Sequence, residues 1–172
     1  MLNLLASPAA VVKDRAAANT VVVSPHHVSI AAGAGAADII SVAGYPTGRH
    51  HTLIKASEAR LAIQSGASEV WVSLDETVAD ANAVLSELIA IREACPDPAR
   101  LGLIVPEAVG ADAADADAAV TAAHQAGYQR LIVRSSAAVN NEESGSGEED
   151  MKKGPALAAA KLPVLKFPAA AV

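Results

Sequence analysis

The sequence alternates between two kinds of segment at a nearly regular spacing. Short runs rich in β-branched and other apolar residues are separated by alanine-rich stretches that have the spacing of helices. The runs lie at 20–24, 38–43, 69–74, 101–105, 129–134 and 162–167. Most steps between them are about thirty residues, the length of a unit of one strand and one helix. Apolar runs with few alternating polar positions are typical of strands buried on both faces. The sequence therefore predicts an α/β fold of parallel βα repeats with about six strands.

Two segments depart from this alternation. The segment 140–154, NNEESGSGEEDMKKG, has no apolar periodicity and is rich in glycine, serine and acidic residues, so it predicts a flexible acidic loop. The apolar segment 1–12 lacks a leading positive charge, and we interpret it as a helix rather than a signal peptide. A second helix is expected at 77–94, where the apolar residues form one stripe. The length of 172 residues suits a single domain, which we assign to 1–172.

Composition excludes several classes of function. The net charge of −6 argues against a nucleic-acid-binding protein, because such proteins carry a basic face. No apolar run reaches the length of roughly eighteen residues that a membrane span needs. The single cysteine, Cys95, excludes an internal disulfide, which fits a reducing compartment. We therefore expect a cytoplasmic protein without nucleic-acid or membrane partners.

The histidines and the glycine-rich stretch do not predict a metal or nucleotide site. Two histidine pairs consist of adjacent residues, which do not share a face of a helix or strand. No carboxylate or cysteine stands at ligand spacing from them, so we assign no metal ligand and no cofactor. The stretch 33–37, GAGAA, precedes a strand instead of following one, unlike a dinucleotide-binding loop. The five histidines are His26, His27, His50, His51 and His124.

Four segments between 21 and 70 occur in an order and spacing that point to a family. They are Val21–Pro25 (VVVSP), Val42–His50 (VAGYPTGRH), Lys55–Ala59 (KASEA) and Ser65–Val70 (SGASEV). Together they resemble the 2-deoxyribose-5-phosphate aldolase family, class I aldolases built on a TIM barrel. The resemblance covers most of the chain and is best between 20 and 75. It implies an incomplete TIM-barrel-like fold. It also implies reversible cleavage of 2-deoxyribose 5-phosphate into glyceraldehyde 3-phosphate and acetaldehyde through a lysine Schiff base, without a metal.

The resemblance places different residues at the family's catalytic positions. Trp71 stands where the family has a proton-shuttling aspartate, and Gly102 stands where it has a lysine. Val133 falls at the Schiff-base lysine. A shift of one residue would offer Arg134, whose guanidinium stays protonated and forms no imine. Asp75 matches a position that is asparagine or aspartate in the family.

Lys166 corresponds to the family's second active-site lysine, at the end of the last predicted strand. The carboxyl end of a parallel strand is where TIM-barrel sites form, and burial there would lower the pKa of the amine. The family follows this lysine with Ser-Gly-Gly, whereas Pro168 and two alanines follow it here. Proline removes a backbone donor, and alanine side chains block the close approach of a phosphate. A vestigial, exposed lysine is the alternative role.

The candidate site follows from these positions. Lys166 and Asp75 are its candidate catalytic residues, and Lys55, Ser135 and Ser136 are its candidate substrate-binding residues. Two of them have structural alternatives. Asp75 either orients a water molecule or caps the helix expected to start near 77. Lys55 either reaches the site or is a solvated or partly buried lysine in the first turn of a helix.

Two functions agree with this sequence. One is an aldolase-like enzyme that acts on a small sugar phosphate or aldehyde, with Lys166 as the imine-forming amine. The other is a non-catalytic relative that keeps the scaffold for assembly or regulation, and the altered lysine, aspartate and phosphate-binding positions favour it.

The predicted number of strands also bears on partners. Six strands do not close a TIM barrel, which has eight, and open sheet edges are a liability. The edges can stay open, they can be covered by terminal helices, or they can be covered by a homo-oligomer or a partner subunit. We expect the last of these arrangements.

Overall fold

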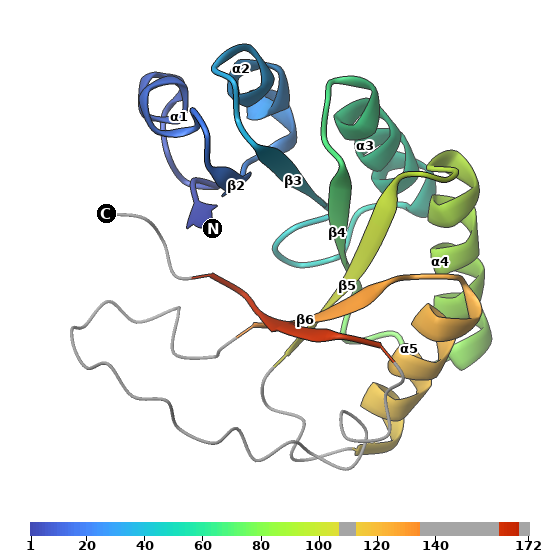
Figure 1. The fold of residues 1–172 in the computed structure, drawn as a ribbon. Helices are drawn as coiled ribbons and strands as arrows, with labels where there is room; N and C mark the ends of the chain where they lie inside the picture. Colours follow the sequence, from blue (N-terminus) through green and yellow to red (C-terminus); the bar gives the residue numbers. More distant parts are fainter. Residues whose placement is uncertain (107–112, 135–161, 169–172) are drawn as a thin grey trace, which may run out of the picture.

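The computed structural model describes residues 1–106, 113–134 and 162–168 (Figure 1). The side chains of residues 106 and 113–117 are not described. Three expectations lie outside the described residues: the flexible loop at 140–154 and the substrate-binding roles of Ser135 and Ser136.

The described strands form one parallel sheet in which each strand pairs with the next one in the chain. The strands are β1 (Leu2–Asn3), β2 (Thr20–Val22), β3 (Asp38–Ala43), β4 (Glu69–Ser73), β5 (Arg100–Pro106), β6 (Arg130–Arg134) and β7 (Val164–Lys166). The sheet curls into an incomplete barrel, and the helices cover its outer face (Figure 1). The predicted α/β fold of parallel repeats and its likeness to an incomplete TIM barrel are confirmed.

The helices occupy the alanine-rich stretches between the strands. None of the described helices is long and apolar enough to cross a membrane. They are α1 (Ala9–Arg15), the short 3-10 helix η1 (Pro25–His27), α2 (Val28–Gly33), α3 (Thr52–Gln64), α4 (Ala81–Ala94) and α5 (Ala113–Gln125).

The first twelve residues differ from the predicted helix. Residues 2–3 form β1, and α1 begins only at Ala9, after Pro8 in extended conformation at the helix N-cap. The backbone N–H of Leu4 continues the ladder by donating to the carbonyl of Val22 at 2.8 Å. The described sheet thus has seven strands instead of six, because a strand of two residues leaves no recognisable apolar run.

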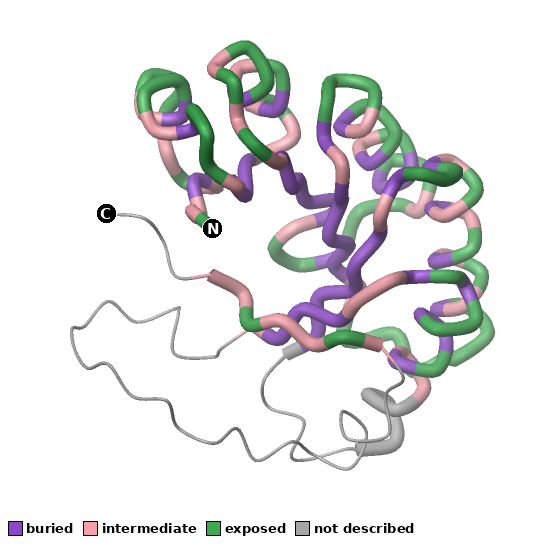
Figure 2. The backbone as a smooth tube through the Cα atoms, viewed as in Figure 1, coloured by how far each residue is buried: buried purple, intermediate pink, exposed green. Residues whose placement is uncertain are grey.

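The fold has two apolar clusters, one on each face of the sheet. The outer cluster lies between the strands and the helices and contains, for example, Val70, Leu101 and Leu131. The inner cluster lies inside the curled sheet, and Figure 2 shows β2 to β6 between the two clusters as mostly buried, whereas the edge strand β7 is partly exposed. This double burial explains why the strands appear in the sequence as unbroken apolar runs. The inner cluster consists of Val22, Ile40, Val42, Trp71, Ile104 and Ile132, with Leu5, Tyr45 and Phe167 packed against it.

A hydrogen bond joins the two edge strands of the described sheet. The side-chain amide of Asn3, in β1, donates from Nδ2 to the carbonyl of Pro168, just beyond β7, at 2.9 Å. The Oδ1 atom of Asn3 accepts from the backbone N–H of Leu5 at 3.1 Å, which orients the amide. The edges therefore meet at their carboxyl ends.

Candidate functional site

The carboxyl ends of the strands form the mouth of the incomplete barrel, where TIM-barrel proteins place their sites. Polar side chains join three of these ends. Arg134, at the end of β6, donates from Nη1 to the carbonyl of Pro46 at 3.2 Å and pairs through Nη2 with Glu76 at 3.2 Å. Arg49 pairs with Asp75 at 3.5 Å. The two arginines thus connect the loops that follow β3 and β4.

Asp75 holds the turn that leads towards α4. Its Oδ1 accepts from the backbone N–H of Thr77 at 3.0 Å and from the Thr77 hydroxyl at 2.7 Å. These hydrogen bonds, with a smaller contribution from Arg49, lower the pKa of Asp75 below its ordinary value. The helix expected from 77 begins at Ala81, and its N-cap is Asp80, which accepts from the Asn82 N–H at 2.9 Å.

Lys55 is fully buried between the sheet and helices α3 and α4. Its Nζ donates to the carbonyl of Gly48 at 2.7 Å and to that of Ser73 at 3.3 Å, and it forms an ion pair with Glu87 of α4. Protein groups therefore enclose the amine on the outer side of the sheet.

Lys166 is exposed and lies beside Val133 in the register of β6 and β7. On β7, Val164 packs against the outer cluster, whereas Phe167 packs against the inner one. Because side chains alternate along a strand, Lys166 falls on the outer side with Val164. In the described part of the chain, Lys166, Asp75 and Lys55 form no hydrogen bond or ion pair with one another.

Apolar groups fill the barrel interior at the level where the family resemblance places catalytic side chains. Trp71 is fully buried and its ring lies beside Gly102. A Cβ atom added to Gly102 would lie 2.8 Å from Cδ1 of Trp71 and would collide with Cδ1 of Ile132. The indole and the isoleucine therefore use the space that a side chain at position 102 would need.

The structure also shows which residue of β6 points inwards. Ile132 belongs to the inner cluster, and Val133, the residue matched to the Schiff-base lysine, belongs to the outer one. Neither residue carries an amine. The inward position next along the strand is Arg134, whose contacts lie at the mouth.

Three of the chain's four aromatic residues gather at the mouth side of this interior. The rings of Tyr45 and Phe167 are stacked with centroids 5.4 Å apart, and Phe167 meets Trp71 edge-on at 5.5 Å. The three rings therefore form one aromatic group packed on the inner cluster.

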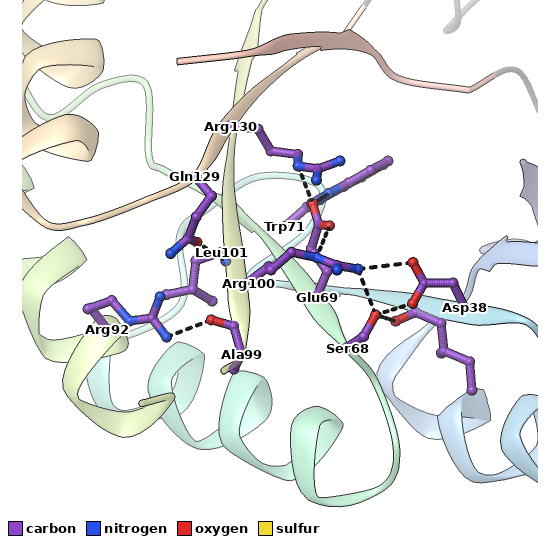
Figure 3. Close-up of polar contacts among 11 residues, drawn as sticks. Asp38, Ser68, Glu69, Trp71, Arg92, Ala99, Arg100, Leu101, Gln129 and Arg130 are labelled. Carbon is purple, nitrogen blue, oxygen red and sulfur yellow. Dashed lines mark hydrogen bonds and ion pairs between the residues drawn. The ribbon is translucent and has the colours of Figure 1, made fainter. Parts of the chain in front are cut away.

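A charged network that the sequence analysis missed lies at the amino ends of the strands (Figure 3). Glu69 is only 1% exposed, and it accepts from Nε1 of Trp71 at 2.7 Å and from Nε of Arg100 at 3.1 Å. Arg130 pairs with the same carboxylate at 3.1 Å, and Arg100 also pairs with Asp38 at 2.9 Å. Charged residues at the first inward position of several strands were the signal that could have predicted it. The network fixes the orientation of the indole.

Known sequences match about half of the chain. No protein-family model matches. The deoxyribose-phosphate aldolase of Corynebacterium glutamicum is 53% identical over 79 residues, which are 44% of this chain and 36% of that protein. The enzyme of the same name from Corynebacterium jeikeium is 48% identical over 92 residues, 52% of this chain and 36% of that protein. The matches thus span little more than a third of these relatives, and over that part the predicted family resemblance is confirmed.

Solved structures show the same relationship at the level of the fold. An aldolase named QR15 superposes with a TM-score of 0.58 and 26% identity, covering 68% of this chain and 53% of its own. The deoxyribose phosphate aldolase of Aeropyrum pernix, described as a tetramer, has a TM-score of 0.63 at 24% identity and covers 80% of this chain and 62% of its own. The second likeness concerns the fold alone.

Proposed function

We propose that this chain is a deoxyribose-phosphate-aldolase-like protein that does not perform the family's aldol cleavage and serves as a scaffold for assembly or regulation. The observation that carries the proposal is the filled interior. Trp71 and Gly102 stand where the family resemblance implies an aspartate and a lysine, and Ile132 fills the space beside them. The indole N–H of Trp71 donates to Glu69, and an indole, unlike a carboxylate, neither takes up nor releases a proton at ordinary pH, so Trp71 cannot replace a proton-shuttling aspartate.

The positions of the lysines support the same proposal. Imine formation needs an uncharged amine that a carbonyl compound can reach. Lys55 is enclosed by two carbonyls and a carboxylate, so no aldehyde has access to it. Lys166 is accessible but falls on the outer side of β7, away from the interior.

The second candidate function is an active lyase that cleaves 2-deoxyribose 5-phosphate or a related small aldehyde. The exposure of Lys166 favours it, because the amine is open to an aldehyde in solution. In this alternative Asp75 remains a catalytic candidate at the mouth, and Ser135 and Ser136 remain candidates for substrate contacts.

Trapping with borohydride distinguishes the two functions. Wild type, Lys166→Ala and the control Lys13→Ala, which removes an exposed lysine on α1, are incubated with 2-deoxyribose 5-phosphate or acetaldehyde, reduced, and measured by intact mass. The proposal expects Lys166 to be labelled no more than the exposed Lys13, so the two variants should carry equal amounts of adduct under conditions that label an intact aldolase. An adduct in wild type and Lys13→Ala that is lost in Lys166→Ala would overturn it and show imine chemistry at Lys166, the step that the lyase needs.

We further propose that the chain forms a homo-oligomer. Large apolar side chains are exposed on one helix, α3, where Leu53, Ile54 and Leu61 are each more than half exposed at 67%, 59% and 60%. The description of the Aeropyrum pernix aldolase as a tetramer is consistent with association through such a surface. Light scattering after size exclusion should show an oligomer that Leu61→Glu dissociates and that Lys13→Glu, exposed on α1 and away from α3, leaves intact. A monomeric wild type would refute the proposal.

A further inference from the structure

We propose that Lys55 is a positioning residue whose buried ammonium group fixes the loop of residues 44–49 at the barrel mouth. This segment, called the rim loop below, carries Tyr45, Pro46 and Arg49, which make the contacts at the mouth described above. The proposal concerns the shape of the mouth, so it holds whether or not aldol chemistry survives.

The carbon chain of Lys55 packs on the first residue of the rim loop. Gly44 has a φ of +70°, and a Cβ atom there would lie 2.5 Å from Cδ of Lys55. The backbone N–H of Gly44 donates to Oε2 of Glu58 at 2.8 Å. Lys55 and Glu58 stand three residues apart on α3 and so project from one side of the helix. Together they hold the start of the loop against α3.

The ammonium group of Lys55 holds the other end of the loop. It donates to the carbonyl of Gly48 at 2.7 Å and to the carbonyl of Ser73, at the end of β4, at 3.3 Å. Gly48 is pressed against the backbone of Leu74, so that a Cβ atom would collide with its carbonyl group. One side chain therefore ties the rim loop to β4 as well as to α3.

Glu87 completes the arrangement from α4. Its carboxylate pairs with Lys55, and its Oε2 accepts from the Thr52 hydroxyl at 3.5 Å. The side chain of Lys55 is 1% exposed and that of Glu87 is 20% exposed. Removing either partner leaves an uncompensated charge in a dry environment, which destabilises a fold strongly. A single substitution thus disturbs stability and loop position together, and the test must separate them.

A double replacement separates the two effects. Lys55→Met removes the ammonium and leaves Glu87 unpaired, whereas Lys55→Met/Glu87→Leu removes both charges and keeps an apolar volume. In the double variant the carbonyls of Gly48 and Ser73 still lack their donor. The free energy of unfolding should recover because no unpaired charge remains, whereas the rim loop should stay loosely held because these two hydrogen bonds are absent.

Hydrogen exchange and urea unfolding measure these two quantities. In wild type the N–H of Gly48 is protected by a 2.8 Å bond to the carbonyl of Gly44. Its exchange should accelerate about tenfold or more in both Lys55 variants, because a hydrogen bond to a charged group is lost. The urea midpoint should fall in Lys55→Met and return in the double variant, and Lys13→Met should change neither. Recovery of the midpoint together with wild-type protection of Gly48 would overturn the proposal, as would unchanged exchange in Lys55→Met.

Chemical modification of the wild-type protein gives an independent test that needs no variant. Reductive methylation of the folded chain should modify the exposed Lys13 and Lys166 and spare Lys55, which should react only after unfolding. Modification of Lys55 at the rate of Lys13 would show that the ammonium is not held, and would likewise overturn the proposal.

Discussion

The packing of Trp71 and Ile132 over Gly102 predicts that one added methyl group is costly. In Gly102→Ala the new Cβ would collide with Cδ1 of Ile132 and lie 2.8 Å from Cδ1 of Trp71. Overpacking of a closed core costs about 1–3 kcal/mol. Because the Trp71 ring is rigid and the end of the Ile132 side chain has to shift inside a packed core, we expect Gly102→Ala to lower the free energy of unfolding by about 2 kcal/mol.

Removing the colliding atom should relieve much of this cost. Ile132→Val deletes Cδ1 and should by itself cost about 0.5–1.5 kcal/mol. In the double variant the two changes compensate, so the loss should be smaller than the sum of the single losses by about 1 kcal/mol. Such coupling is expected of side chains in direct contact.

Urea unfolding followed by fluorescence measures these values, since Trp71 is the only tryptophan and lies inside the barrel. Gly33→Ala is the matched control, because Gly33 ends α2 and its added Cβ meets nothing within 4 Å. That change should leave stability unchanged or raise it by up to about 1 kcal/mol. A neutral Gly102→Ala, or strictly additive effects in the double variant, would refute the reasoning that the interior is full.

Three further predictions concern Asp75, Cys95 and Asn3. Hydrogen bonds from Thr77 lower the pKa of Asp75 from its ordinary 3.8. The stability that its carboxylate contributes should therefore be complete above that value and vanish as the pH falls through the lowered pKa. The urea midpoints of wild type and Asp75→Asn should converge at low pH. A difference between the two midpoints that stays constant with pH would contradict this. Burial raises the pKa of the Cys95 thiol, so a thiol reagent at neutral pH should label it only after unfolding. Rapid labelling of the folded chain would contradict the burial of this thiol. Asn3→Asp removes the amide donor at the edge of the sheet and should speed hydrogen exchange in β7. The same change at Asn19, whose side-chain amide donates only to nearby carbonyls, should not. Equal effects of the two substitutions would argue against the link between Asn3 and Pro168.

The repeating pattern of the fold was predictable because each buried strand carries its own run of apolar residues. The strand expected at 38–43 is β3 with the same bounds, and the run at 69–74 differs from β4 by one residue. Strands with both faces covered need β-branched and other apolar residues at nearly every position. The two-residue β1 has no such run, and only its pairing with β2 makes it a strand.

The same double burial concealed the direction of side chains. Between its two terminal arginines the run of β6 is apolar at Leu131, Ile132 and Val133, so no polar residue among these three shows which face is which. The sequence therefore does not show that Val133, matched to the Schiff-base lysine by the resemblance, faces outwards beside the inward Ile132, nor that Lys166 falls on the outer side. The enclosure of Lys55 depends on Glu87, in another helix, so no local pattern could reveal it.

The hydrogen bond between Asn3 and Pro168 has a consequence for the order of assembly. Every strand of the described sheet pairs with its neighbour in the chain, so each pairing can form as soon as one more βα unit has left the ribosome. The link from Asn3 spans 165 residues and has to wait for the last described strand. Contacts of such separation form late, since the entropy of closing the loop is lost first. Of the described strands, β1 is therefore the one whose edge waits longest for its contact, which leaves it open to a chaperone or a neighbouring nascent chain for the longest time.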